Sequence, residues 1–166
     1  MRFLNKISRI EDGVEIPGRY TYAFIHNGRY FLSEIKIYKD GMIDCWDLVN
    51  FEEFKQKIAQ GWVVTTLPNN VEVSVGFLAT FKATDVQAAV KEEEFIKEVA
   101  DEIEKLNGRP TSIDKCVKAF QRFQDEQSED ARQYLEDAYE AVPEHLRWFM
   151  LDEMDTNIDV RAALMH

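Results

Sequence analysis

Residues 19–38 read RYTYAFIHNGRYFLSEIKIY, two apolar-rich runs on either side of Asn27-Gly28. Asn-Gly is the strongest short signal for a two-residue hairpin turn, because both central positions of a type I′ turn need positive φ. Pairing outward from this turn predicts that Phe24 lies opposite Phe31. We therefore expect the chain to open its main sheet with an antiparallel hairpin.

The next turn, at residues 39–41, leads into MIDCWDLV and allows two registers. A two-residue loop would set Glu34 opposite Asp47 and pair like charges. A three-residue loop with its glycine in the left-handed conformation sets Lys36 opposite Asp44, which pairs opposite charges. We therefore predict the three-residue loop and a three-stranded meander.

The two faces of this meander differ in composition. One face is expected to form the core: Tyr20, Tyr22, Phe24, Phe31, Ile35, Ile37, Ile43 and Cys45. The other face is mixed, and six of its side chains could form an aromatic and charged platform for a ligand: Tyr30, Glu34, Lys36, Tyr38, Asp44 and Trp46. The alternative, which we favour, is that this face packs against a helix, because a two-layer domain must cover a sheet face.

A helix is expected over residues 50–60, because Asn50 and Glu53 have the spacing of a capping box. Residues 62–67 and 71–82 then return to strand composition, and apolar residues alternate strictly from Val71 to Phe81. About five antiparallel strands with one inserted helix predict a small curved sheet or partial barrel.

After Thr84 the apolar period becomes that of a helix, with helices expected over about 92–107, 112–127 and 128–142 and a fourth after Pro143. The expected fold class is therefore α+β. It has an antiparallel β unit at 1–83 followed by an acidic four-helix unit at 84–166, or a single composite domain of the two.

Motifs for common chemistries are missing from the sequence. There is no Gly-rich phosphate loop and no Gly-x-Ser-x-Gly nucleophile turn. Asp155-x-Asn157-x-Asp159 resembles the start of a calcium loop, but its sixth position is Val160 and its twelfth is His166, where Gly and Glu are needed. We expect no metal, no cofactor and no catalytic residue.

The distribution of charge is the main functional signal. Residues 1–83 contain ten Lys and Arg and ten Asp and Glu, whereas residues 84–166 contain ten and twenty-one, so the net charge of −11 lies in the second half. This asymmetry favours a non-catalytic binding protein of the immunity, inhibitor or adaptor type, whose acidic helices engage a basic protein partner. Glu93, Glu94 and Asp101 are the charges that we expect such a partner to contact.

Two other classes of function stay open. A hydrolase could use carboxylates in a cleft between the two halves. A nucleic-acid-binding protein could use Arg19, Arg29, Lys36 and Lys39 with the tyrosines of the sheet, although a net charge of −11 argues against phosphate contacts.

The address expected from the sequence is the cytoplasm. The first ten residues, MRFLNKISRI, are interrupted by polar residues and do not form a signal peptide. No apolar run reaches about 18 residues, so we expect no membrane association. Cys45 and Cys116 are expected to be small buried thiols, which suits a reducing compartment.

Overall fold

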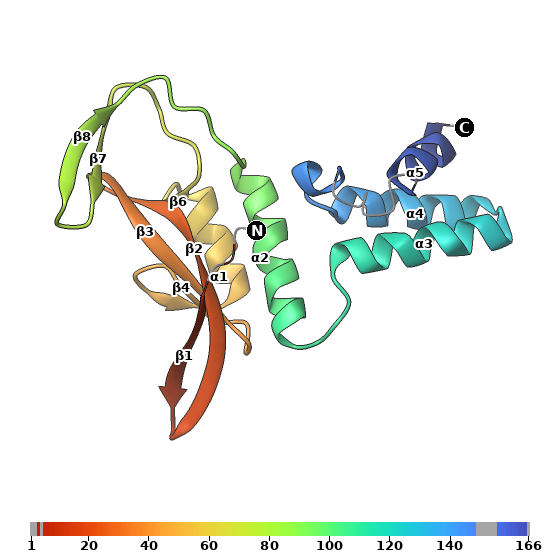
Figure 1. The fold of residues 1–166 in the computed structure, drawn as a ribbon, viewed down its shortest axis with the longest axis horizontal. Helices are drawn as coiled ribbons and strands as arrows, with labels where there is room; N and C mark the ends of the chain where they lie inside the picture. Colours follow the sequence, from red (N-terminus) through yellow and green to blue (C-terminus); the bar gives the residue numbers. More distant parts are fainter. Residues whose placement is uncertain (1–2, 4, 149–155, 166) are drawn as a thin grey trace. The chain divides into compact units, whose positions relative to one another are not determined.

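The computed structural model describes residues 3, 5–148 and 156–165 of the chain (Figure 1). Its strands are β1 (Lys6–Glu11), β2 (Val14–Asn27), β3 (Arg29–Tyr38), β4 (Ile43–Asp44), β5 (Leu48–Val49), β6 (Val63–Val64), β7 (Val71–Val75) and β8 (Ala79–Ala83). Its helices are α1 (Phe51–Ala59), α2 (Glu92–Leu106), α3 (Ser112–Glu126), α4 (Glu129–Ala141), the 3-10 helix η1 (Glu144–Leu146) and α5 (Thr156–Met165). The predicted α+β class, with a sheet followed by helices, is confirmed.

The chain divides into two compact units, Met1–Asn107 and Gly108–His166. Helix α2 belongs to the first unit because Phe95 and Val99 are buried in the same core as the sheet residues Ile35 and Ile37. The expected boundary at residues 83 and 84 falls before α2, whereas the observed one falls after it. The helices α3, α4, η1 and α5 lie in the second unit.

The sheet of the first unit is open and is built around the long β2–β3 hairpin. At one end of this hairpin the strand order is β1-β2-β3-β4-β5. At the other end β6 pairs with β2, and β7 pairs with β3 in parallel before β8 adds to β7. The parallel pair is an addition to the antiparallel sheet that we expected.

The first hairpin, β1–β2, was missed by the sequence prediction. Its turn is Asp12-Gly13, and both residues have positive φ, 50° and 77°. Asp-Gly is a favoured pair for a type I′ turn for the same reason as Asn-Gly. The signal was therefore present in the sequence, and β2 begins at Val14 instead of about residue 19.

The predicted register of the β2–β3 hairpin was wrong by one residue. Phe24 pairs with Leu32, not Phe31, and Asn27 pairs with Arg29 across Gly28 alone. A one-residue slip moves every side chain of a strand to the other face. Thr21, Ala23 and Ile25 of β2 are therefore buried, and the tyrosines and Phe24 that we assigned to the core lie on the opposite face.

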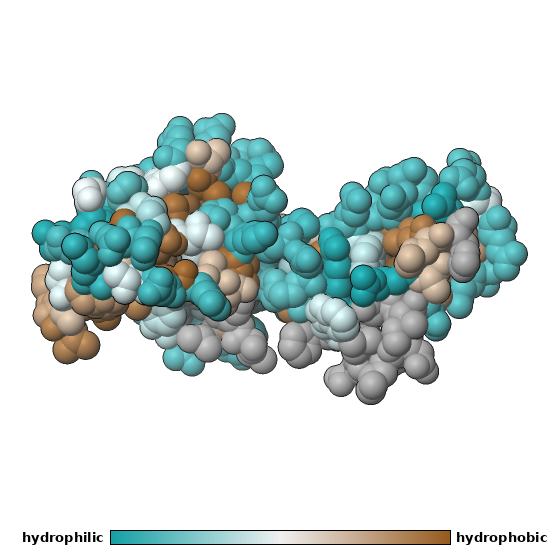
Figure 2. Space-filling view, turned by 90° about the horizontal axis from the view of Figure 1, so that it is seen from above, coloured by the Kyte–Doolittle hydropathy of each residue, from teal (hydrophilic) through white to brown (hydrophobic). Residues whose placement is uncertain are grey.

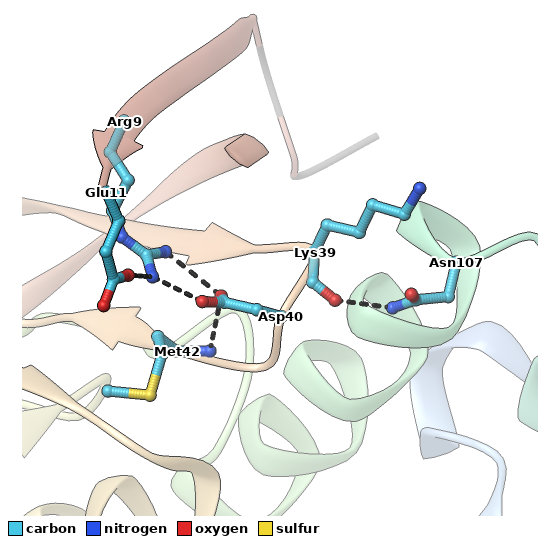
Figure 3. Close-up of polar contacts among 6 residues, drawn as sticks. All are labelled: Arg9, Glu11, Lys39, Asp40, Met42 and Asn107. Atoms are coloured by element: carbon cyan, nitrogen blue, oxygen red, sulfur yellow. Dashed lines mark hydrogen bonds and ion pairs between the residues drawn. The ribbon is translucent and has the colours of Figure 1, made fainter. Parts of the chain in front are cut away.

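The predicted register of β3–β4 is confirmed. Lys36 pairs with Asp44 and Ile37 with Ile43, and Gly41 has φ +86°. Three further contacts hold this turn in place (Figure 3). Arg9 of β1 binds the Asp40 carboxylate, the Met42 amide donates to Asp40 Oδ1 at 3.2 Å, and the Asn107 side-chain amide donates to the Lys39 carbonyl at 2.7 Å. The hydrogen bond from Arg9 holds the pKa of Asp40 below its usual range.

The single strand predicted over residues 71–82 is instead the hairpin β7–β8. Its turn contains Gly76, with φ +51°, followed by Phe77 and Leu78. Val75 pairs with Ala79 and Val73 with Phe81, so apolar residues occupy every second position, in step, both before and after the turn. The alternation therefore continued through the turn and concealed it.

The core of the first unit lies between one face of the sheet and the helices α1 and α2 (Figure 1). Helix α1 begins at the predicted capping box, in which Asn50 and Glu53 exchange hydrogen bonds at 2.9 Å. Phe54 of α1 and Phe95 of α2 meet edge to face with their ring centroids 6.0 Å apart. Both are fully buried, and burying an aromatic ring of this size contributes roughly 2–3 kcal/mol.

The second unit has its own apolar core. Cys116 and Phe120 of α3 pack with Leu135 of α4, with Val142 just after α4, and with Val160 of α5. Helix α3 begins at a Thr111–Asp114 capping box, and Ser128 caps α4 through the Ala131 amide. Of the fourth helix expected after Pro143, residues 144–146 form η1, and its positions Phe149, Met150 and Met154 lie outside the described residues.

Both cysteines are buried thiols, as expected. Burial raises the pKa of each thiol to about 11, so neither is a thiolate near neutral pH. Within the described part of the chain, every helix is too short or too polar to cross a lipid bilayer.

Candidate binding surfaces

In the part of the first unit that the structure describes, the helices α1 and α2 pack on one face of the sheet, and we call the other face the open face. The registers place these residues on it: Tyr20, Tyr22, Phe24 and His26 of β2, Tyr30, Leu32, Glu34, Lys36 and Tyr38 of β3, Asp44 of β4, Val71, Val73 and Val75 of β7, and Ala79, Phe81 and Ala83 of β8. Val73 and Ala83 are buried beneath their neighbours. Tyr22, Leu32 and Phe81 are exposed. Tyrosine, phenylalanine and other aromatic residues are enriched at protein interfaces, so this face is a candidate binding surface.

Five of the six residues predicted to form a ligand platform lie on the open face. Tyr30 is stacked on His26, with ring centroids 4.2 Å apart. Tyr38 is buried beneath the Arg9 guanidinium, which lies 4.5 Å from its ring centroid. The ring of Tyr38 lies directly over Gly18, where a Cβ would come within 2.7 Å of it. Tyr38 is therefore part of the packing and is not available to a ligand.

Trp46, the sixth platform residue, lies on the opposite side of the sheet. Its indole N–H donates to Ser33 Oγ at 3.1 Å, and its ring packs against Phe31 at 5.1 Å and Trp62 at 5.9 Å. Phe31 and Ser33 occupy every second position of β3 together with the core residues Ile35 and Ile37, so they point to the core face, opposite to Lys36. The prediction failed because β4 ends at Asp44, where the chain leaves the strand conformation.

The backbone around Trp46 is unusual. Trp46 has φ +75°, which costs about 1–2 kcal/mol for a residue with a Cβ. The Asp44 carboxylate stabilises this conformation by accepting from the Trp46 amide at 3.2 Å. Despite its contacts, 47% of Trp46 stays exposed. The ring therefore offers an aromatic surface to a partner from a fixed position.

We call Phe31, Trp46 and Trp62 the Trp46 cluster, and a lysine of the chain already lies beside it. Lys57 Nζ lies 4.9 Å from the ring centroid of Trp62 and 2.7 Å from Asp47 Oδ2. The hydrogen bond with Asp47 raises the pKa of Lys57. An external ammonium group would have to displace Lys57, so the cluster is better suited to apolar contact than to cation recognition.

The acidic residues predicted on α2 have different environments. Glu93 is exposed, whereas Glu94 is half-buried and pairs with Lys97 at 3.1 Å, and Asp101 is half-buried. Glu102 on the same helix is buried and lies 3.6 Å from the Arg19 guanidinium. Burial raises the pKa of Glu102, and the nearby charges of Lys105 and Arg19 oppose that rise. Of the three predicted contact residues, Glu93 is the one placed on an exposed surface.

A second group of acids lies around the turn between α3 and α4, and we call it the acidic turn: Asp125, Glu126, Glu129 and Asp130. All four are exposed. Arg122 pairs with Glu126 at 2.9 Å and Arg132 with Glu129 at 3.1 Å. These residues were not among those predicted from the sequence, although four acids within six positions are a visible signal.

No group of three or more metal-ligating side chains is found among residues 3, 5–148 and 156–165. Asp155, the first position of the calcium-loop resemblance, lies outside these residues.

The fold and these surfaces define an α+β protein with an open aromatic sheet face and an acidic helical unit. Residues 6–110 match the family described as Domain of unknown function (DUF7638), and because this match covers more than half of the chain, the protein belongs to that family. Residues 111–165 match Domain of unknown function (DUF7639). No curated protein and no solved structure matches the chain. The two family matches meet between α2 and α3, close to the division between the two compact units.

Proposed function

We propose that this protein is a non-catalytic binding protein, of the immunity, inhibitor or adaptor type, that engages a basic protein partner through its acidic helical half. The observation that carries this proposal is the segregation of charge. Residues 1–83 are balanced, and the whole net charge of −11 lies in residues 84–166. Solubility alone does not require such a segregation, whereas recognition of a cationic surface does benefit from it.

The acidic turn is the part of the second unit best placed for this role. Residues 108–166 contain thirteen Asp and Glu against seven Lys and Arg. Two of those cations, Arg122 and Arg132, already pair with Glu126 and Glu129, and exposed Asp125 and Asp130 add further negative charge beside these pairs. The anionic field of this surface would draw a basic partner into encounter and orient it.

The open face supports a binding role in a different way. Charge mainly sets the rate and specificity of association, whereas buried aromatic and apolar contacts supply most of the affinity. Tyr22 and Leu32 are exposed on a sheet face that the helices of the first unit leave uncovered. Both kinds of contact are therefore available in one chain.

The nucleic-acid alternative has less support. Arg19 lies beside the buried Glu102, and Arg29 pairs with Glu72 at 3.1 Å. Phosphate contacts dominate the affinity of nucleic-acid-binding proteins, and two of the four cations expected to make them have carboxylate partners. The hydrolase alternative would be favoured by turnover of a substrate that depends on a carboxylate.

The test is affinity capture from the native host, followed by mass spectrometry, with the wild type and two charge variants. In the first variant, Asp125→Lys and Asp130→Lys reverse the acidic turn. In the control, Glu15→Lys and Glu52→Lys change the net charge by the same amount on exposed residues of 1–83, and Glu52 matches Asp130 in lying in the first turn of a helix. We expect a basic protein to be retained by the wild type and the control and lost by the acidic-turn variant. Equal retention by all three, or capture of nucleic acid, would count against the proposal.

A further inference from the structure

The strand β8 is an edge of the sheet that the fold leaves available for pairing. Among the described residues β8 pairs with β7 alone. Its five residues read ATFKA, with a single charge at Lys82, no proline and no bulge. Proteins usually protect an edge strand with charges, proline or a bulge. The opposite edge, β1, has this protection, since Lys6, Arg9 and Glu11 occupy three of its six positions.

Large apolar side chains beside this edge are exposed. Phe77 at the tip of the β7–β8 hairpin is fully exposed, Leu78 is 86% exposed and Phe81 is 50% exposed. Hydrophobic surface gathers at the left edge of the molecule in Figure 2, where Figure 1 places this hairpin. Contiguous apolar surface of this kind on a soluble domain marks an interaction site.

We infer that β8 pairs with β8 of a second copy of this chain, antiparallel and centred on Phe81, to form a two-fold symmetric dimer with a continuous sheet. A two-fold axis requires one patch to be complementary to itself, so each residue must be acceptable opposite its own partner. This register sets Phe81 opposite the partner's Phe81 and Thr80 opposite the partner's Lys82. The inference goes beyond the proposed function and does not depend on it.

The direction of the backbone groups in β8 fits this register. The Ala83 carbonyl accepts from the Asn70 amide at 2.9 Å, so Ala83 points its polar groups toward β7. Because these groups alternate in direction along a strand, those of Phe81 also point toward β7, and those of Thr80 and Lys82 point to the free edge. The two-fold axis makes the Thr80–Lys82 pair occur twice. Together the two pairs use all of the backbone N–H and C=O groups of Thr80 and Lys82 that point to the free edge.

The side chains fit the same register. Phe81 forms a pair without direct backbone hydrogen bonds, in which opposite Cα atoms lie about 4.5 Å apart and the side chains are closest. The two rings would cover each other on the open face. Lys82 meets Thr80 and not another lysine, so no like charges oppose one another. In the same register, the tip of the β7–β8 hairpin comes close to Thr84 and Val86 of the second copy, which follow its Ala83. Val86 is 46% exposed.

The balanced charge of the strand segments does not oppose a second copy as the occupant. Residues 1–83 contain equal numbers of acidic and basic residues, so two copies can meet at β8 with little net repulsion between these segments. A pair of five-residue strands is smaller than the roughly 1,200 Å² typical of stable interfaces, so we expect a weak, concentration-dependent dimer with a Kd of about 10–100 µM.

The test is sedimentation velocity of the full chain across about 1–200 µM, a range that brackets this Kd. Phe81→Ser should leave a folded monomer at every concentration, because the half-exposed ring contributes little to the core of one chain. Circular dichroism and thermal unfolding check that this variant folds.

Three substitutions at Thr80 test the register. All of them remove the hydroxyl contact with Ser74 at 3.1 Å. Glutamate and glutamine are nearly equal in size and differ in charge, and lysine places a positive charge opposite Lys82 of the second copy. Thr80→Glu should bind more tightly than Thr80→Gln, and Thr80→Lys more weakly, each by about 2- to 30-fold because the pair occurs twice. A wild type that is monomeric throughout, or a dimer unaffected by Phe81→Ser, would overturn the inference. A dimer that does not follow the order Glu, Gln, Lys at Thr80 would overturn the register.

Discussion

Replacing Glu92 with glutamine removes one negative charge from a contact that fastens α2 to the loop after β6. Glu92 Oε1 accepts three hydrogen bonds, from the Thr65 amide at 2.9 Å, the Thr66 amide at 2.8 Å and the Thr66 hydroxyl at 2.6 Å. Burial of the carboxyl raises its pKa, but the hydrogen bonds from Thr66 and Thr65 outweigh that effect, and the pKa of Glu92 is lowered below its ordinary value of 4.5.

The size of the effect follows from these bonds. A hydrogen bond to a charged group contributes about 1.5–3 kcal/mol, against about 0.5–1.5 for a neutral one. Glutamine can still accept hydrogen bonds through its amide oxygen, so Glu92→Gln loses only the difference in energy between charged and neutral hydrogen bonds. The energies of three hydrogen bonds to one oxygen do not add fully. Because Glu92 lies in the first turn of α2, loss of its charge also removes about 0.3–1 kcal/mol of favourable interaction with the helix dipole. After allowance for partial exposure, we expect a loss of about 1–2 kcal/mol.

The assay is urea unfolding followed by tryptophan fluorescence in a Trp148→Phe background, so that Trp46 and Trp62 of the first unit give the signal. At pH 7 the midpoint should fall by about 0.5–1 M, since m for domains of this size is about 1–3 kcal/mol per M. Glu93→Gln is the matched control, because Glu93 lies in the same helical turn but is exposed. It should lose the helix-dipole contribution alone.

The pH dependence gives a second check on Glu92. A carboxyl whose pKa is depressed by folding stabilises the folded state above its unfolded pKa, and this stability is lost as pH falls through the folded value. The difference between wild type and Glu92→Gln should therefore be constant above about pH 5.5 and shrink below pH 4.5, the ordinary value. Equal losses for the Glu92 and Glu93 variants, or a difference that grows on acidification, would refute this reasoning.

Three further predictions follow from the fold. Gly41→Val should destabilise the first unit by more than about 1 kcal/mol in urea unfolding, because Gly41 has φ +86° and a Cβ there meets nothing within 4 Å, so the cost is conformational; a neutral result would disprove the left-handed turn. Phe95→Ala should cost roughly 3–5 kcal/mol by the same measurement, because the ring is fully buried against Phe54; a loss below about 1 kcal/mol would contradict its place in the core. Calcium or zinc should leave the Tm unchanged in calorimetry, because a ligand that binds only the folded state must raise it; a clear rise with calcium would revive the loop at Asp155.

Local signals in the sequence predicted strand registers and helix starts correctly where charge or capping chemistry favours a single arrangement. The β3–β4 register follows from the charges of Lys36 and Asp44 together with a glycine suited to positive φ, and α1 follows from the Asn50–Glu53 capping box. The β2–β3 register could not be chosen in this way, because both faces of β2 are apolar. Tyr22 and Phe24 carry as much apolar surface as Ala23 and Ile25, and packing against Phe54 and Phe95 decides which set is buried.

The binding surfaces were harder to predict than the elements. Pairing of β3 with β7 joins segments about 40 residues apart, and no local pattern specifies it. It places Phe81 of β8 on the open face, with β7 between β8 and β3, and leaves β8 as the edge. Trp46 moved to the other face because its amide bonds to Asp44 and the strand ends there, a turn signal that Asp44 and Asp47 on either side of Cys45-Trp46 could have given.

The association rate of the captured basic partner, measured by stopped flow as a function of salt, tests the central proposal most directly. An exposed anionic surface accelerates encounter, and the effect weakens as the screening length shortens to about 8 Å at 0.15 M salt and about 3 Å at 1 M. We predict that the rates of the wild type and of the Glu15→Lys, Glu52→Lys control fall steeply with added salt. The rate of the Asp125→Lys, Asp130→Lys variant should be lower at low salt and nearly flat. Equal, salt-independent rates for all three proteins would contradict the proposal, and the exposed face of Trp46 would become the surface to examine.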